Sequence, residues 1–169
     1  MASDIILRPW RRSDVPSLEL YANNRKIWLN LRDRFPHPYT RSDAENWTAF
    51  CELHSDPTTN FAITLNDEAI GGVGCERLGD VHCKTVEIGY WLGEPFWGRG
   101  FATTALMRMT DYAFETLAAE RIQAMVFKWN PASARVLAKA GYLLEGRLQR
   151  SIFKDGRLGD SYLYARTRP

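Results

Sequence analysis

The segment Trp97-Gly98-Arg99-Gly100-Phe101-Ala102 carries the clearest chemical signal in the sequence. It follows a strand-like run and precedes an amphipathic helical pattern, so its glycines allow consecutive backbone N–H groups to point at one place. The unpaired amides in the first turn of a helix and the helix dipole both favour an anion. The segment therefore predicts a turn that cradles phosphate.

Two common nucleotide motifs do not account for this turn. Gly98-Arg99-Gly100 could begin a G-x-G-x-x-G fingerprint, but Thr103 occupies the position of the third glycine. No acidic residue closes a second strand about twenty residues further on, and no G-x-x-x-x-G-K-[ST] segment occurs. A nicotinamide or P-loop nucleotide is therefore excluded, and the turn binds phosphate of another kind or none.

The composition indicates one globular domain that covers residues 1–169. With 45% hydrophobic and 12% aromatic residues, the chain can bury a proper core. Lys and Arg number 22 against 20 Asp and Glu, and a net charge of +2 is too small to indicate nucleic-acid binding. We therefore expect a small ligand rather than a polymer.

The cysteines and the apolar pattern bear on the compartment. Cys51, Cys75 and Cys83 are odd in number without paired spacing, and the start Met-Ala-Ser-Asp lacks a signal sequence, so we expect a cytoplasmic protein. No apolar run approaches the roughly 18 residues needed to cross a bilayer, so no membrane partner is expected. The histidines are scattered without ligand spacing, so no metal is expected.

The elements that must position the turn follow from periodicity and capping signals. Strands are predicted at 5–8, 61–65, 69–76, 86–92, 121–127, 148–153 and 161–164. Helices are predicted at about 14–24, from a capping box at 42–45 to about 54, at 103–117, and over about ten residues between an Asn130 cap and Gly141. This order predicts an α/β fold, with one mixed sheet covered by helices.

Three segments of this chain resemble the core of the GNAT N-acetyltransferase superfamily. They are Glu87–Leu92, the Trp97–Ala102 turn, and Asn130-Pro131-Ala132-Ser133 through Lys139-Ala140-Gly141-Tyr142. The RimJ/RimL branch is echoed in Phe35-Pro36-His37-Pro38-Tyr39, Leu144-Glu145-Gly146 and Tyr164-Ala165-Arg166. The resemblance implies a single GNAT domain, with a mixed, mostly antiparallel sheet splayed around an acyl-CoA site and about four flanking helices.

The resemblance also implies acetyl-CoA as co-substrate and a role for each segment. Backbone amides of the turn would hold the pyrophosphate, at Gly98, Arg99, Gly100, Phe101, Ala102 and Thr103. Trp97 stands where the family has Gln or Arg, and this difference should weaken cofactor binding little if main-chain amides bind the pyrophosphate. The strand around Tyr90, Trp91 and Leu92 would pair with the pantetheine arm. Asn130 would touch pantetheine, although an Asn-Pro helix start needs a cap in any case.

Catalysis needs a base, an oxyanion donor and an acid. By resemblance, Ser133 would protonate the leaving thiolate, although its hydroxyl could merely bond the backbone. Glu87 would be the base or position a water, although a strand Glu is often a solvent-facing charge. Ile152 stands where some relatives carry a carboxylate, so a water chain or Glu76 stays open as the base.

Other groups in the sequence could serve the same chemistry. A backbone N–H at Trp91 or Leu92 could serve the oxyanion. Tyr90 and Tyr142 could donate protons, yet aromatic residues at such positions are more often core. No cysteine has a recognisable activating partner, which favours direct transfer in a ternary complex.

The acceptor side is less specific. Trp28, Phe35 and Tyr39 could line an amine pocket or belong to the core. The resemblance implies transfer of acetyl to a protein N-terminal α-amine or a small amine; the alternative is a non-catalytic acyl-CoA-binding module. Antibiotic or polyamine acceptors would need an acidic pocket, against which the arginines at 32, 34 and 41 argue mildly. Pairing of exposed edge strands could give a homodimer.

Overall fold

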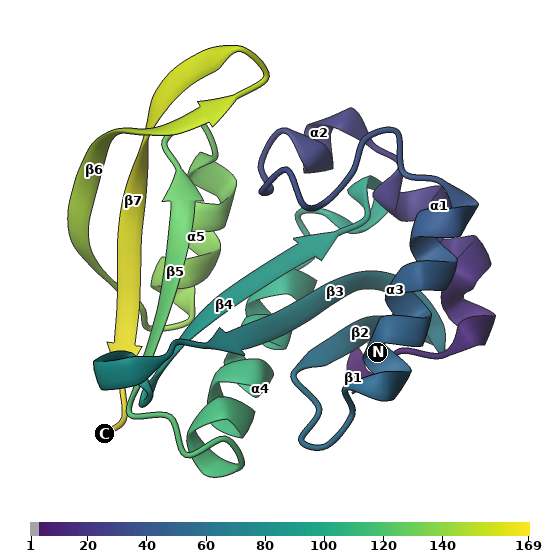
Figure 1. Ribbon diagram of the computed structural model, residues 1–169, viewed down its shortest axis with the longest axis horizontal. Coiled ribbons are helices and arrows are strands. Elements are labelled where there is room, and N and C mark those ends of the chain that lie inside the picture. Colours follow the sequence, from purple (N-terminus) through teal and green to yellow (C-terminus); the bar gives the residue numbers. More distant parts are fainter. Residues whose placement is uncertain (1–3) are drawn as a thin grey trace.

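The computed structural model describes residues 4–169 (Figure 1). Residues 1–3, part of the start that was predicted to lack a signal sequence, lie outside the described residues. The strands are β1 (Ile6–Pro9), β2 (Asn60–Leu65), β3 (Glu68–Arg77), β4 (Thr85–Leu92), β5 (Arg121–Phe127), β6 (Leu143–Lys154) and β7 (Arg157–Thr167). The α-helices are α1 (Val15–Ala22), α2 (Arg25–Trp28), α3 (Arg41–Leu53), α4 (Phe101–Glu115) and α5 (Pro131–Lys139).

The strands form one seven-stranded sheet in the order β1-β2-β3-β4-β5-β7-β6. Neighbouring strands are antiparallel except β4 and β5, which run parallel, so the predicted mixed and mostly antiparallel sheet is confirmed. The parallel pairing joins only Thr85–Glu87 to Arg121–Gln123. Figure 1 shows β4 and β5 diverging beyond that point. The sheet is therefore split between its two halves.

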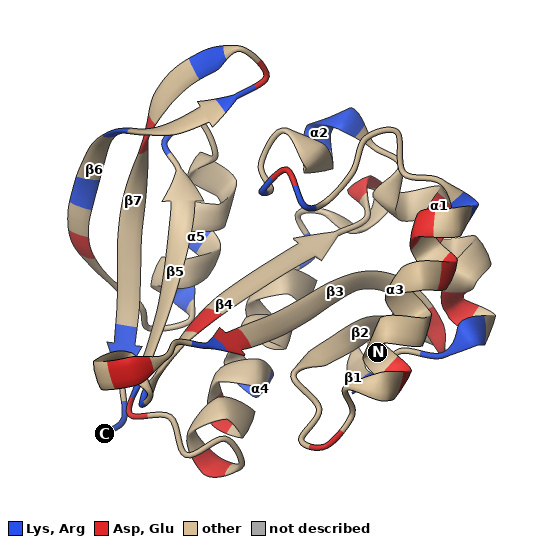
Figure 2. Ribbon diagram, in the orientation of Figure 1, with Lys and Arg blue, Asp and Glu red and all other residues tan. Residues whose placement is uncertain are grey.

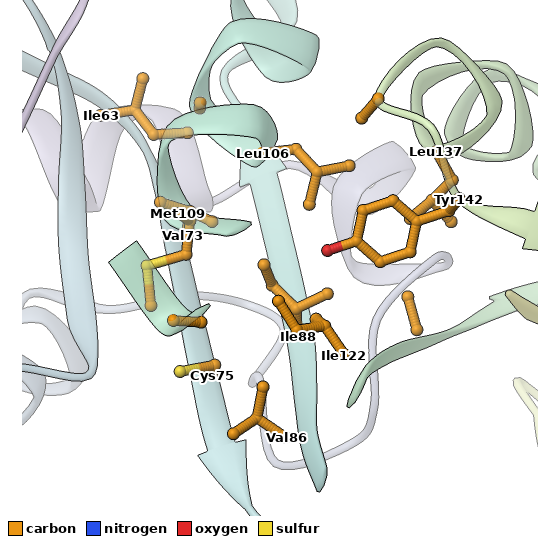
Figure 3. Packing of buried hydrophobic residues seen from close by; sticks show 14 of the residues in the cluster. Ile63, Val73, Cys75, Val86, Ile88, Leu106, Met109, Ile122, Leu137 and Tyr142 are labelled. Carbon is orange, nitrogen blue, oxygen red and sulfur yellow. The ribbon is translucent and has the colours of Figure 1, made fainter. Parts of the chain in front are cut away.

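Hydrophobic packing covers both faces of the sheet. Helices α4 and α5 pack on one face and α1 and α3 on the other (Figure 1). The predicted apolar stripe of α4 is buried, and Figure 3 shows Leu106 near Ile88 and Ile122 of the sheet and Met109 beside Val73. Burying a side chain such as Leu106 contributes about 1.5–3 kcal/mol. The stripe therefore fixes α4, and with it the glycine turn at its start, against β4.

Helix starts differ in part from the prediction. The box that begins α3 is Thr40 with Asp43, so the predicted box at 42–45 is wrong: Thr40 accepts from the Asp43 N–H and Asp43 accepts from the Thr40 N–H. Helix α4 begins at Phe101, because Gly100 serves as its N-cap. The expected ends of α5 are confirmed: Asn130 is its N-cap, and Gly141 follows it with a φ of +83°.

Two regions were under-predicted. The single turn of α2 was missed, which adds a fifth helix to the expected four. Strands β6 and β7 are longer than the predicted 148–153 and 161–164. The pairing of β6 with β7 is irregular between Leu144 and Gly146 and between Leu148 and Ile152, and Arg150 has a φ of +54°. Such bulges break the two-residue alternation that identifies a strand in sequence.

Candidate active site

The split between β4 and β5 leaves backbone groups available on both strands. Among the residues described, β4 pairs only with β3 beyond Glu87, and β5 pairs only with β7 beyond Gln123. The predicted pantetheine strand, Tyr90 to Leu92, lies on this open stretch. An extended, amide-rich chain can therefore lie between the strands and hydrogen-bond as a further strand would.

The glycine turn lies after β4 and opens α4. Gly98 and Gly100 have φ values of +75° and +82°, a region that L side chains rarely adopt. Gly100 has no side chain with which to cap α4. The first amides of α4 therefore lack the side-chain acceptor that Asn130 provides for α5. This arrangement suits an anion, as the sequence predicts.

Two side chains shape this turn. The Trp97 indole N–H donates to the Leu92 carbonyl oxygen at 2.6 Å, which ties the turn back to the end of β4. The Arg99 guanidinium lies 4.6 Å from the centre of the Phe101 ring, at the helix start. Trp97 thus holds the turn in place from a position where the family resemblance expects Gln or Arg.

Ser133 lies in the first turn of α5 and faces β4. Its N–H donates to Asn130 Oδ1 at 3.2 Å, so the Asn130 side chain acts as the helix cap. Its hydroxyl lies 2.7 Å from the Tyr90 hydroxyl, and the Ser133 carbonyl oxygen is a second, longer acceptor for the Tyr90 hydroxyl at 3.2 Å. Tyr90 was predicted to contribute only its backbone. The Ser133 hydroxyl therefore has a side-chain partner on the opposite side of the split.

The two carboxylates considered as bases are both paired with arginines. Glu87 forms an ion pair with Arg32, and its side chain is 20% exposed. Glu76 pairs with Arg34 at 3.1 Å and is 62% exposed. Glu87 lies opposite Glu76 in β3 and opposite Gln123 in β5, at the point where the strands separate. Of the two carboxylates, Glu87 is the more buried and lies nearer the split.

The three aromatic residues predicted on the acceptor side divide into two groups. Tyr39 is buried, and Phe35 packs between Tyr39 and Trp91 with ring centroids 5.1 and 5.7 Å away. Tyr39 belongs to the core cluster under α1 and α3, and the partly buried Phe35 packs against that cluster. Trp28 is half-buried at the end of α2, with Lys154 Nζ 3.7 Å from its ring centroid. Of the three, only Trp28 contacts the C-terminal hairpin.

Segment 25–34 is fastened to the β6–β7 hairpin and to the loop between β5 and α5 by contacts that sequence reasoning missed. Lys154, with a side chain 3% exposed, pairs with Asp33 at 2.6 Å, and Arg25 pairs with Asp155 at 2.5 Å. The Trp129 indole N–H donates to the Leu29 carbonyl oxygen at 3.2 Å. We call these contacts the clasp. Figure 1 shows α2 facing the β6–β7 hairpin across the divergent ends of β4 and β5.

Charge is concentrated around the clasp. Figure 2 shows Lys and Arg on α2, on the loop after it and on the hairpin, with acidic residues between them. A surface groove of about 440 Å³ beside the clasp is lined by Lys128, Trp129, Leu158, Gly159 and Asp160. Because Ser133 and Glu87 do not line that groove, the separation of the strands defines the site better than the groove does.

Comparison with known proteins identifies the class. The model of the GNAT acetyltransferase domain matches residues 4–143. The chain therefore belongs to the GNAT acetyltransferase domain family. Within the described residues, no helix is long and apolar enough to cross a membrane.

The chain is similar to several individual GNAT proteins. The ribosomal-protein-serine acetyltransferase of Escherichia coli is 34% identical over 106 residues, covering 63% of this chain and 59% of that protein. The spermidine N(1)-acetyltransferase of Vibrio cholerae is 27% identical over 95% of this chain and 91% of that protein. RimJ of Mycobacterium smegmatis, solved with a CoA-disulfide, has a TM-score of 0.84 at 25% identity, over 96% of this chain and 81% of that one. The chain spans 57% to 59% of the length of three curated relatives, the E. coli protein among them.

Proposed function

We propose that this chain is an acetyl-CoA-dependent N-acetyltransferase that transfers an acetyl group directly to a primary amine in a ternary complex. The observation that carries the proposal is the split between β4 and β5, which has beside it the Ser133 hydroxyl and the start of α4, where no side chain caps the helix. Membership of the GNAT family and relatives named as amine acetyltransferases support it.

The split and the glycine turn fit the co-substrate. The pyrophosphate would be held by the backbone amides of the turn and the first residues of α4, namely Gly98, Arg99, Gly100, Phe101, Ala102 and Thr103. The pantetheine arm would lie along β4 from Tyr90 to Leu92 and would contact Asn130. Open strand edges suit the amides of that arm, and helix amides without a side-chain cap suit the phosphates. Acetyl-CoA supplies the thioester carbonyl that the amine attacks.

The residues of the chain then move two protons. Glu87, once released from Arg32 or through a water, accepts the proton that the acceptor ammonium must lose before it can attack. As the carbon–nitrogen bond forms and the carbon–sulfur bond breaks, Ser133 gives its hydroxyl proton to the thiolate and regains one from solvent, and the acylated nitrogen releases its second proton to solvent. The products are an N-acetylated amine and free CoA thiol.

The acceptor is a protein N-terminal α-amine or a small amine. Arg32 and Arg34 lie beside the proposed base, and Lys154 fills the space between Trp28 and Asp33. Each of these cations is paired with a carboxylate, but release of Glu87 from Arg32 would leave the guanidinium free beside the acceptor, where it would repel a polycation and attract a peptide carboxylate. The charges therefore favour an acceptor peptide over a polyamine, with Trp28 as the aromatic wall; Phe35 and Tyr39 would support it from below.

Release of free thiol from acetyl-CoA tests the function on a panel of acidic peptides, neutral peptides and spermidine. We expect turnover with peptides. Ser133→Ala and Glu87→Gln should each lower kcat by about a hundredfold, within the range of general acid–base catalysis, while CoA affinity measured by calorimetry stays nearly unchanged. A chain that binds acetyl-CoA but releases no thiol with any acceptor would be the non-catalytic acyl-CoA-binding module.

Two further proposals concern the setting of the protein. A cytoplasmic location is supported by three cysteines that form no disulfide, Cys51 and Cys75 buried and Cys83 exposed. A homodimer is supported by β6, an edge strand with Leu143 and Leu144 exposed. Sedimentation velocity of the purified chain decides between monomer and dimer.

A further inference from the structure

The Tyr90 side chain crosses the split that separates the two halves of the sheet. Tyr90 belongs to β4, and its hydroxyl reaches Ser133 on α5, 2.7 Å from the hydroxyl oxygen. Among residues 4–169, no other residue of β4 makes a side-chain hydrogen bond to α5. The contact therefore joins the strand predicted to hold pantetheine to the helix that carries the proposed acid.

The hydroxyl protons of this pair determine what Ser133 can do. Each hydroxyl has one hydrogen. The Tyr90 hydrogen has two acceptors within reach, Ser133 Oγ at 2.7 Å and the Ser133 carbonyl oxygen at 3.2 Å, and the shorter contact is the better hydrogen bond. If the Tyr90 hydroxyl donates to Ser133 Oγ, the hydrogen of Ser133 is left free for a third atom. If Ser133 donates to Tyr90 instead, its hydrogen is turned away from any thiolate. Burial raises the pKa of the Tyr90 phenol, so Tyr90 keeps its proton and stays a donor at neutral pH.

We propose that Tyr90 is a positioning residue for Ser133: its hydroxyl donates to Ser133 Oγ and leaves the Ser133 hydrogen directed at the departing thiolate. The inference rests on the proposed function. When Ser133 gives up its proton, negative charge develops on Oγ, and a hydrogen bond to a charged acceptor is stronger than one to a neutral acceptor. Tyr90 keeps its own proton throughout, and Ser133 is reprotonated from solvent.

A second tyrosine provides a matched control. The Tyr142 hydroxyl lies 2.7 Å from Thr110 Oγ1, in the core between α4 and the start of β6. Tyr142 is 2% exposed, and burial raises the pKa of its phenol to about 12. Changing either tyrosine to Phe removes one hydroxyl from a 2.7 Å pair with a hydroxyl partner, but only Tyr90 contacts Ser133.

The test compares Tyr90→Phe, Tyr142→Phe, Ser133→Ala and the double variant Tyr90→Phe with Ser133→Ala, by steady-state thiol release and thermal unfolding. Tyr90→Phe should lower kcat about tenfold to hundredfold, as expected for loss of a hydrogen bond to a developing charge, and change the KM for acetyl-CoA less than about twofold. Tyr142→Phe should lower the Tm by about as much as Tyr90→Phe does, and it should leave kcat unchanged. In the Ser133→Ala background, Tyr90→Phe should cause no further loss of kcat.

Several outcomes would overturn the inference. Equal kcat losses in the two Phe variants would mean that Tyr90 acts through stability alone. Additive losses with Ser133→Ala would mean that Tyr90 acts independently of Ser133. An unchanged kcat in Tyr90→Phe would overturn the positioning role while leaving the proposed function intact, whereas a wild-type chain without turnover would overturn both.

Discussion

The two sides of the candidate site use different kinds of groups: backbone groups on one side and side chains on the other. The side proposed to bind the cofactor uses consecutive backbone groups, in the Gly98–Gly100 turn with the start of α4 and in the capped start of α5. The side proposed to bind the acceptor uses side chains that are far apart in sequence: Arg32 and Glu87 are separated by 55 residues, Asp33 and Lys154 by 121, and Arg25 and Asp155 by 130. Backbone geometry can serve any member of a family, whereas such pairs can change with the acceptor.

The sharpest way to break this comparison is to disturb the backbone of the turn. Gly100→Val places a β-branched residue at a φ of +82°, which should force the turn out of shape. Loss of two charge-assisted hydrogen bonds at about 1.5 kcal/mol each would raise the dissociation constant for acetyl-CoA about 100-fold. Isothermal titration calorimetry measures the change.

The control for this variant is Gly156→Val. Gly156 has a φ of +71° in the turn between β6 and β7, and open space surrounds the position of a Cβ there, as at Gly100. The backbone strain is therefore similar, but the turn is remote from α4. Should Gly156→Val weaken CoA binding as much as Gly100→Val, the turn before α4 would have no special role as a phosphate cradle.

The same contrast explains what sequence analysis could find. The glycine turn, the Asn130 cap, Gly141 and the buried stripe of α4 all depend on neighbours within a few residues, and each was predicted correctly. The Tyr90–Ser133 contact joins residues 43 apart, so it depends on the sheet order, which periodicity does not specify. The clasp was missed for the same reason, and because the single turn of α2 is too short to show a helical period.

Removing one ion pair of the clasp should have a smaller effect than Gly100→Val, and it should act on the binding of the acceptor. Lys154→Met keeps an unbranched side chain over Trp28 but removes the ammonium that pairs with Asp33. Because segment 25–34 would then be held less firmly over the split, we expect the KM for the acceptor to rise about tenfold while the KM for acetyl-CoA stays within about twofold. Steady-state kinetics with each substrate varied in turn measures both constants.

Arg121→Met is the matched control for the clasp. Arg121 pairs with Glu145 at 2.5 Å at the other end of β5, so the variant removes a cation from the same half of the sheet without touching segment 25–34. Its KM values should equal those of the wild type. If Lys154→Met raised the KM for acetyl-CoA instead of the KM for the acceptor, the division of the site into a cofactor side and an acceptor side would be wrong.

The smallest expected effect is on the stability of the folded protein at acidic pH. Asp160 accepts hydrogen bonds from the Arg150 N–H at 2.9 Å and from Arg147 Nε at 2.7 Å, and these donors hold the pKa of its carboxyl below the ordinary 3.8. A carboxylate whose pKa falls on folding stabilises the folded state above its unfolded pKa, and that contribution is lost as the pH falls through the folded pKa. The β6–β7 hairpin should therefore lose support below about pH 4, whereas the α4 turn, held by backbone geometry, should not.

Asp160→Asn separates this contribution from the rest. The variant should unfold at a lower urea concentration than the wild type at about pH 7, and the gap should narrow as the pH falls below 3.8 and through the lowered pKa of the folded wild-type carboxyl. Asp111→Asn, an exposed position on α4, makes the same charge change away from the hairpin and should show a smaller gap at neutral pH. A gap between Asp160→Asn and the wild type that stayed constant across this range would mean that the Asp160 charge contributes nothing. The acceptor side would then be held by packing, as the cofactor side is held by its backbone.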